Sequence, residues 1–275
     1  MKVHHVNCGT MCPLARRWVN GDGGLFERGA MVAHVLIVEA PHGLVLVDTG
    51  LGTGDVADPG RLGPFNLFAS PTLSREETAL ARVQALGHDA GDVRDIVLTH
   101  LDLDHAGGLG DFPRARVHVF RPEHAAAMAR ASRNERARYL PAQWAHGPSW
   151  SLHEPDGERF FGLESVRAVP ETNDDVLIVP LVGHTRGHSG VAVRGERGWL
   201  LHAGDSYFHR DEIHRTPAGC PVGLRLFQAA AAVDDGNRRH NQARLRELRA
   251  SAPEVRVFSA HDPVELDELT SPEQK

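Results

Sequence analysis

Short apolar runs alternate with segments of helical character along most of the chain. The runs at 32–39 and 44–47 are joined by a Pro-His-Gly turn and predict a hairpin. A capping-box pattern that begins at Ser74 predicts a helix ending near Leu86. Strands in bunches between helices predict sheets with helices packed outside them, a layered α/β architecture. Further strands are expected at 96–99, 117–120, 176–182, 190–194, 198–202 and 255–259, and further helices at 122–130 and 236–250.

The predicted strand at 96–99 ends in residues that can bind metal ions. The segment His100-Leu101-Asp102-Leu103-Asp104-His105 places two imidazoles and two carboxylates within six residues. Such groups are costly in a passive scaffold because each must be solvated or paired. A strand end is a rigid platform that can aim several of them at one point. The segment therefore indicates a metal site, against the alternative of a polar loop that is rich in histidine.

Three later strand ends carry more residues of the same kind. The run at 176–182 leads into Gly-His-Thr-Arg-Gly-His, which contains His184 and His188. Asp205 follows the strand at 198–202, and His261 follows the last strand. Together these residues predict a centre with nitrogen and oxygen ligands and no thiolate. Such a ligand set suits zinc, iron or manganese better than Cu(I) or an iron–sulfur cluster.

Composition limits the possible classes of protein. A chain of 275 residues that is 41% hydrophobic can bury a large core, and no linker divides it, so we expect a single domain over 1–275. The formal net charge of −6, with no block of lysine and arginine, argues against a nucleic-acid partner. The basic stretch at 238–249 is interpreted as the solvated face of a helix.

The chain start and the cysteines bear on location. The N-terminal residues lack the apolar core of a signal peptide, and no apolar run reaches transmembrane length, so we expect a cytoplasmic protein without a membrane partner. The three cysteines, Cys8, Cys12 and Cys220, are too few for a disulfide framework. We expect them to be reduced.

In order and spacing, the motifs resemble those of the metallo-β-lactamase-fold hydrolases over nearly the whole chain. That signature is His-x-His-x-Asp-His, followed by a distant His, a bridging Asp and a final His. The Gly-His-Thr-x-Gly-His segment and the long insert after Asp48-Thr49-Gly50 look most like the lactonase branch, which includes acyl-homoserine lactonases. The resemblance implies a four-layer αβ/βα sandwich, with two metals in a shallow cleft between the sheets. It also implies that Asp48 supports the site without binding metal.

The same resemblance implies a set of ligands and cofactors. The cofactors would be two divalent metal ions, with zinc expected first and iron or manganese as alternatives. His184 is expected to have a structural role rather than to bind metal. The implied ligands are His100, Asp102 and His188 for one ion, Asp104, His105 and His261 for the other, and Asp205 as a bridge between them.

Asp102 departs from the family pattern, because most hydrolases of the fold have a second histidine there. Three aspartates and a bridging hydroxide would balance the charge of two divalent ions, whereas a histidine would leave one net positive charge. A neutral cluster is a weaker Lewis acid, and it favours harder ions such as iron or manganese. Flavodiiron oxidoreductases of this fold have a carboxylate at the same point, but they need a fused flavin domain. We expect no such domain after His261.

The implied reaction is hydrolysis of an ester, foremost a lactone, by attack of a hydroxide held between the metals. Asp104 is expected to carry the proton, and Tyr207 is expected to donate a hydrogen bond to the carbonyl. The lactonases have their tyrosine one position later, where this chain has Phe208, so an ordinary packed tyrosine is the alternative. Other candidate functions are a thioesterase of the hydroxyacylglutathione hydrolase kind, an organophosphate hydrolase and a β-lactamase. A sensor or scaffold that binds metal without turnover is the non-enzymatic alternative.

Three long connections, at 52–71, 139–150 and 208–226, carry apolar and aromatic residues. Structured loops of this length are often lids or interfaces. They suit the acyl chain of a small-molecule ester or lactone, and they equally suit a homodimer contact.

Overall fold

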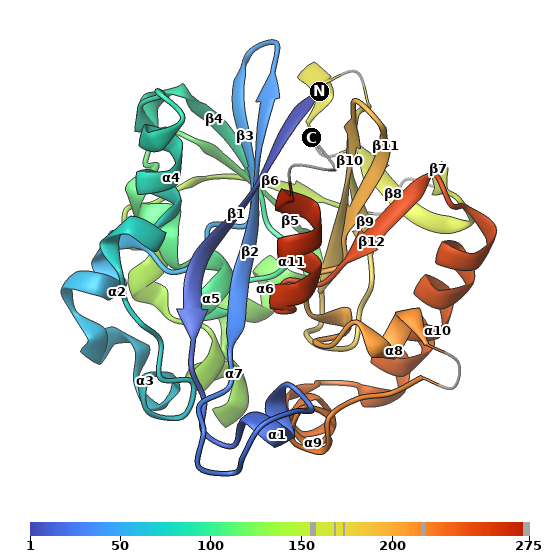
Figure 1. The fold of residues 1–275 in the computed structure, drawn as a ribbon. Coiled ribbons are helices and arrows are strands. Elements are labelled where there is room, and N and C mark those ends of the chain that lie inside the picture. Colours follow the sequence, from blue (N-terminus) through green and yellow to red (C-terminus); the bar gives the residue numbers. More distant parts are fainter. Residues whose placement is uncertain (155–157, 168, 173, 216–217, 272–275) are drawn as a thin grey trace.

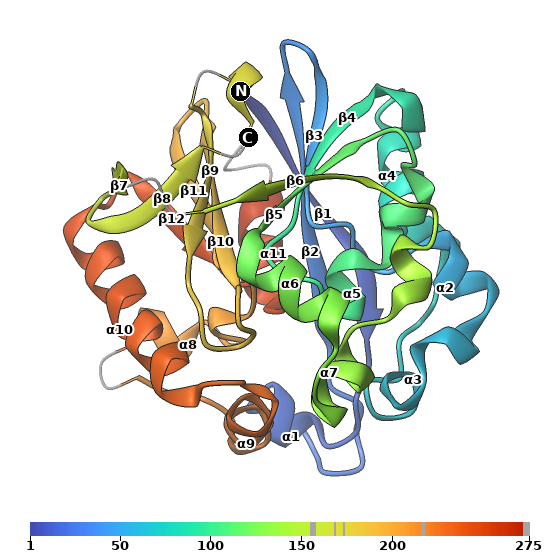
Figure 2. The same cartoon turned by 180° about the vertical axis from the view of Figure 1, so that it is seen from behind.

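In the computed structural model, which describes residues 1–154, 158–167, 169–172, 174–215 and 218–271, the strands form two six-stranded sheets that face each other (Figures 1 and 2). The first sheet contains, in spatial order, β1 (Lys2–Met11), β2 (Met31–Ala40), β3 (Gly43–Val47), β4 (Val93–Val97), β5 (Arg116–Phe120) and β6 (Ser149–His153). The second contains β12 (Val255–Phe258), β11 (Gly198–His202), β10 (Ser189–Gly195), β9 (Val176–Pro180), β8 (Leu163–Arg167) and β7 (Glu158–Phe160).

Strand direction decides where the polar segments meet. Strands β3, β4, β5 and β6 run parallel, so their carboxyl ends lie at one edge of the first sheet. Strands β11 and β12 are also parallel, and the Ala203 amide donates to the Phe258 carbonyl at 2.8 Å just beyond them. The segments that follow β4, β11 and β12 are therefore brought to a common end of the sandwich.

The buried side chains form three layers of core. Between the sheets, valines and leucines such as Leu36 and Val47 pack against Ile178, Val193 and Phe258. Each fully buried side chain of this size contributes about 1.5–3 kcal/mol. Two further clusters lie on the outer faces of the sheets, under helices. The expected four-layer αβ/βα sandwich is confirmed.

Helices cover both outer faces and one end of the sandwich. Helices α4 and α6 lie outside the first sheet, α10 lies outside the second, and α1, α3, α7 and α9 gather at the end where the polar segments meet (Figures 1 and 2). None of the helices in the described ranges combines the length and apolar character that a membrane span needs. The helices are α1 (Arg16–Val19), α2 (Thr53–Ala57), α3 (Pro64–Phe68), α4 (Ala79–Ala85), α5 (Leu103–Ala106), α6 (Arg121–Ala129), α7 (Arg133–Arg138), α8 (Asp211–His214), α9 (Val222–Ala231), α10 (Asp235–Ser251) and α11 (Pro263–Thr270).

The predicted helix start at Ser74 is wrong. A 3₁₀ turn occupies Arg75–Glu77, and α4 begins only at Ala79, where Thr78 is the N-cap. The carboxylate of Glu77 cannot complete a capping box, because it accepts hydrogen bonds from the Thr10 amide at 2.8 Å and the Thr10 hydroxyl at 2.9 Å. A contact between residues far apart in sequence has thus replaced a local one.

Candidate metal centre

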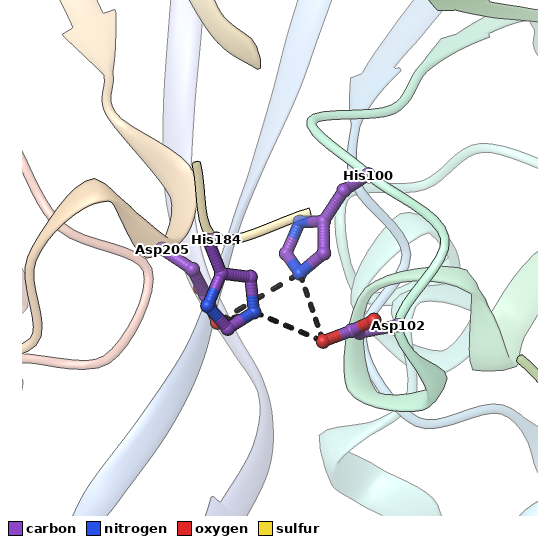
Figure 3. A group of neighbouring side chains, drawn as sticks. All are labelled: His100, Asp102, His184 and Asp205. Atoms are coloured by element: carbon purple, nitrogen blue, oxygen red, sulfur yellow. Dashed lines mark hydrogen bonds and ion pairs between the residues drawn. The ribbon is translucent and has the colours of Figure 1, made fainter. Parts of the chain in front are cut away.

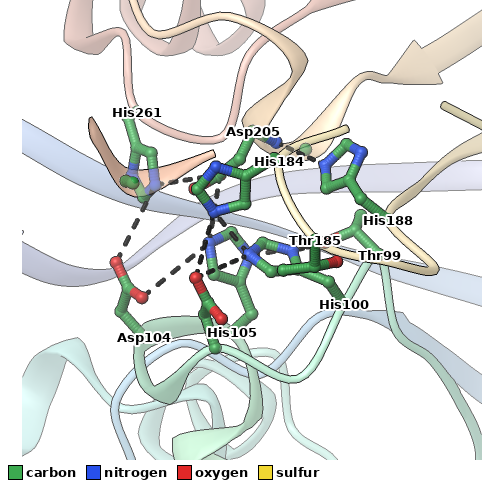
Figure 4. A network of polar contacts seen from close by, with 12 residues as sticks. Thr99, His100, Asp104, His105, His184, Thr185, His188, Asp205 and His261 are labelled. Carbon is green, nitrogen blue, oxygen red and sulfur yellow. Dashed lines mark hydrogen bonds and ion pairs between the residues drawn. The ribbon is translucent and has the colours of Figure 1, made fainter. Parts of the chain in front are cut away.

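Seven side chains converge where the strands end, and they form two groups. Within each group the candidate ligand atoms lie within 4.8 Å of one another. Figure 3 shows the first group, and Figure 4 shows the second group with three residues of the first, His100, His184 and Asp205. The first group is His100, Asp102, His184 and Asp205, and the second is Asp104, His105 and His261.

In the first group, two imidazoles face one oxygen of Asp102. The Oδ2 atom of Asp102 lies 3.0 Å from His184 Nε2 and 3.4 Å from His100 Nε2. The Oδ2 atom of Asp205 lies 3.3 Å from His184 Nε2 and 3.7 Å from His100 Nε2. Four donor atoms therefore surround one small volume (Figure 3).

In the second group, Asp205 contributes its other oxygen. Its Oδ1 atom lies 3.2 Å from His105 Nε2 and 3.0 Å from His261 Nε2. Asp104 lies further out, 3.8 Å from His261 Nε2 and 4.0 Å from His105 Nε2. Because its two oxygens face different groups, Asp205 stands between them (Figure 4).

The donor atoms have the properties of metal ligands. His100 Nε2, His105 Nε2 and Asp205 Oδ1 are buried and lack a hydrogen-bond partner, which is unfavourable for a polar atom inside a protein. The Nδ1 atoms of two of the histidines in these groups are engaged: His105 Nδ1 contacts Asp48 at 2.8 Å, and His261 Nδ1 donates to the Val32 carbonyl at 2.8 Å. Such bonds fix the ring orientation of metal-binding histidines. His184 Nδ1 is buried and has no hydrogen-bond partner among the described residues. The residues present fit two divalent ions.

Electrostatics keeps the carboxylate of Asp205 ionised. Burial raises the pKa of Asp205, but His261 and His105 outweigh burial and hold that pKa well below its ordinary value. Burial lowers the pKa of His105, but Asp205 and Asp48 outweigh it and raise the pKa well above the ordinary value. The carboxylates therefore create a strong demand for positive charge at this point, which a divalent cation can meet.

Asp48 has the supporting role that was expected of it. Its carboxylate accepts hydrogen bonds from the Thr99 amide at 2.7 Å and the Thr99 hydroxyl at 2.8 Å, and it contacts His105. It also adopts a positive φ of 59°, which is uncommon for a residue other than glycine. The turn after β3 is therefore shaped to aim this carboxylate at the segment that follows β4.

The geometry reverses the roles expected for His184 and His188. His188 donates through Nδ1 to the Leu181 carbonyl at 2.9 Å, so its Nε2 is an acceptor, and it accepts the Asp205 amide at 2.8 Å. With both ring nitrogens occupied, His188 holds the backbone of Asp205 and is not among the grouped donor atoms. His184 stands in its place. Two histidines in one loop cannot be told apart without the loop's fold.

Tyr207 is not at the site, contrary to expectation. It is fully buried in the outer core of the second sheet, where its hydroxyl donates to Glu265 at 2.9 Å. The backbone at Tyr207 is extended, so the next side chain points to the opposite side. That residue, Phe208, stacks on the His261 ring with centroids 4.8 Å apart. The alternative of an ordinary packed tyrosine is confirmed.

Glu123, on α6, was missed by sequence reasoning. Its buried carboxylate accepts from the Leu101 amide at 3.0 Å, the Tyr139 hydroxyl at 3.0 Å, the Thr185 hydroxyl at 2.6 Å and the Gly187 amide at 3.0 Å. It thereby ties together the two loops that carry His100 and His184. A Cβ at Gly187 would lie 2.2 Å from the Glu123 backbone, so the loop needs glycine there.

A cavity of about 670 Å³ opens onto the two groups. Asp102, Asp104, His184, Asp205 and His261 lie at its base. Its walls are largely apolar, with Trp18, Phe65, Phe68, Phe208 and Phe227 among them, and come mainly from α1, α3, α7 and α9. Helix α7 contributes the polar part of the wall, with Asn134, Glu135 and Arg138. The loop at 52–71 thus contributes wall residues, as does the part of 208–226 that is described; residues 216–217 lie outside the described residues.

Comparison with known proteins fits this geometry. The model of the metallo-beta-lactamase superfamily matches residues 28–261. The chain belongs to that superfamily. It is 42% identical over 264 residues to a probable metallo-hydrolase of Mycobacterium tuberculosis, and the matched region is 96% of this chain and 81% of that protein. It is 26% identical over 211 residues to an N-acyl homoserine lactonase of Bacillus cereus, which covers 73% of each.

Solved structures agree on the fold. An N-acyl homoserine lactone hydrolase with the product N-hexanoyl-L-homoserine at its catalytic metal centre superposes with a TM-score of 0.70. That similarity covers 97% of this chain and 95% of the other, at 22% identity, and so concerns the fold alone. The resemblance drawn from the motifs is confirmed, and the chain is a hydrolytic enzyme of a superfamily whose members bind divalent metals.

Proposed function

We propose that this enzyme is a dinuclear metal-dependent hydrolase that cleaves an ester bond, with a lactone carrying an apolar acyl chain as its substrate. The observation that carries the proposal is the pair of donor groups that share Asp205 at the base of an apolar cavity. The similarity to N-acyl homoserine lactonases supports the choice of a lactone.

The proposed ligands follow from the geometry. His100, Asp102 and His184 would hold the first ion, Asp104, His105 and His261 the second, and Asp205 both. Bound divalent ions supply Lewis acidity, which polarises a carbonyl and lowers the pKa of bound water. We propose zinc, because imidazole nitrogens outnumber carboxylates in the set.

The chain's own residues would position the substrate and move the proton. Asp104 lines the cavity and makes only long contacts, of 3.8 and 4.0 Å, to its neighbouring histidines. Its outer position suits transfer of a proton to the leaving alkoxide. Phe208, stacked on His261, would hold the acyl chain beside the ester.

The cavity favours a lactone over the thioester alternative. Glutathione is polar and charged, whereas the cavity walls are apolar and its two arginines are already engaged. Arg186 pairs with Glu135 at 2.7 Å, and Arg138 pairs with Asp102 at 3.0 Å. The acyl chain of a lactone needs no charged partner.

A substrate panel tests the proposal. Purified enzyme with measured metal content is assayed with lactones of increasing acyl length, a glutathione thioester, a phosphotriester and a β-lactam. We expect kcat/KM to be highest for lactones and to rise with acyl length. Preference for another class would refute the lactone proposal. Absence of turnover of every substrate by enzyme with two bound metals would favour the sensor or scaffold.

Several expectations from the sequence stay predictions. They are the single domain over 1–275, the cytoplasmic location, the homodimer, and the absence of nucleic-acid and membrane partners.

A further inference from the structure

Asp102 has two oxygens with different partners. Its Oδ2 atom faces the imidazoles of His100 and His184 (Figure 3). Its Oδ1 atom lies 3.0 Å from Nε of Arg138, the last residue of α7. One carboxylate thus joins the first donor group to a guanidinium. A histidine at this position has no oxygen with which to do the same.

Arg138 is held firmly against the first donor group. Its side chain is only 13% exposed. It donates to the His184 carbonyl at 2.9 Å and to the Ala231 carbonyl at 2.9 Å. A guanidinium stays charged at any ordinary pH, and a charge removed from water needs an opposite charge beside it. Asp102 supplies that charge.

The pair restores the charge that Asp102 disturbs. With histidine at 102, Asp104 and Asp205 would give the ligand set two negative charges. Asp102 adds a third, and Arg138 cancels it, so the total returns to two. We propose that Arg138 is the charge partner of Asp102 and that the pair sets the metal affinity and metal preference of the first position. This inference rests on the proposed dinuclear site.

The proposal revises the expectation that Asp102 favours iron or manganese. With Arg138 included, the centre has the formal charge of a site with histidine at 102, and zinc is expected. It also means that the two residues are exchangeable together but not singly. Asp102→His leaves the guanidinium facing a cation, whereas Arg138→Gln leaves an uncompensated carboxylate.

The test measures zinc binding in wild type, D102H, R138Q and D102H/R138Q by competition with a chromophoric chelator. Two zinc dissociation constants are measured, one for each proposed metal. The constant that is lost in His184→Ala belongs to the first metal, which His100, Asp102 and His184 would hold. Affinity should follow net charge: D102H weakest, wild type and the double variant within about threefold of each other, and R138Q tightest. We expect at least tenfold between successive levels, which corresponds to about 1.4 kcal/mol. R138Q should also bind manganese better relative to zinc.

Arg186→Gln is the matched control, because Arg186 lines the same cavity but is 56% exposed and pairs with Glu135. It should change zinc affinity by less than threefold and should not rescue D102H. A parallel series uses Asp102→Asn in place of D102H, because asparagine has nearly the size of aspartate and removes its charge. Melting curves of the metal-free proteins identify any variant that does not fold.

If Arg138 merely orients Asp102, R138Q weakens zinc binding and the double variant binds no better than D102H. Either result overturns the inference, as does rescue of D102H by R186Q. Failure of the proposed function has a different signature: wild type then binds fewer than two zinc ions, whatever the order of the variants.

Discussion

Glu123 offers a strong test of how the site is assembled, because one carboxylate serves four donors from two ligand loops and from Tyr139. Replacement by glutamine preserves the shape but leaves one acceptor oxygen. The Oε1 position can keep the Leu101 amide and the Tyr139 hydroxyl. The new amide group then faces the Thr185 hydroxyl and the Gly187 amide, and both lose their acceptor.

Hydrogen bonds to a charged group contribute about 1.5–3 kcal/mol each, and the Thr185 hydroxyl can turn to accept from the new amide. We therefore expect Glu123→Gln to lower the free energy of unfolding by about 3 kcal/mol. For a chain of 275 residues, this corresponds to a fall in Tm of about 5 °C. Because the loops carrying His100 and His184 lose their link, zinc affinity should fall as well.

Urea unfolding of the metal-free protein and chelator competition measure the two effects. Tyr139→Phe is the graded control, since it removes one of the four donors and should cost about 1.5 kcal/mol. A Glu123→Gln variant within 1 kcal/mol of wild type, with unchanged zinc affinity, would show that the carboxylate does not hold the loops together.

Other variants separate the remaining roles. His188→Ala should destabilise the metal-free protein by about 2 kcal/mol, because the Asp205 amide and the Leu181 carbonyl lose their buried partner, and urea unfolding measures this. Tyr207→Phe should keep kcat within about threefold of wild type, and a hundredfold loss would show that Tyr207 takes part in catalysis. Asp104→Asn should lower kcat by about 10² or more in enzyme reloaded with metal; retained activity would exclude it as ligand and proton carrier. Phe208→Ala should raise KM for long-chain lactones more than for short-chain ones. An equal rise for both would show that Phe208 does not contact the acyl chain.

The ends of several strands could be predicted from the sequence, because an apolar run stops there and polar motif residues follow. The segment after β4 and the segments after β11 and β12 arrive where the motifs placed them. The N-terminal strand β1 was not predicted, because it alternates histidine, asparagine and small residues and so lacks an apolar run. Its place at the edge of the sheet depends on pairing with β2.

The errors at the site share one physical origin. His184 and His188 differ in their hydrogen-bond partners. Only the folded loop shows that the two ring nitrogens of His188 are hydrogen-bonded to the Leu181 carbonyl and the Asp205 amide. Glu123 and Arg138 lie on helices that carry no motif, and their roles exist only because α6 and α7 pack against the ligand loops. Motifs identify donor atoms, whereas their neighbours are set by packing between distant segments.

Metal stoichiometry tests the central claim most directly. Protein purified without chelator, reloaded with zinc and freed of excess ion is analysed by elemental analysis, together with His184→Ala and His188→Ala. The two-group site predicts two zinc ions per chain in wild type, about one in His184→Ala, and two in any His188→Ala protein that folds. One zinc or less in reloaded wild type, or loss of an ion from folded His188→Ala with two retained in His184→Ala, would contradict this account.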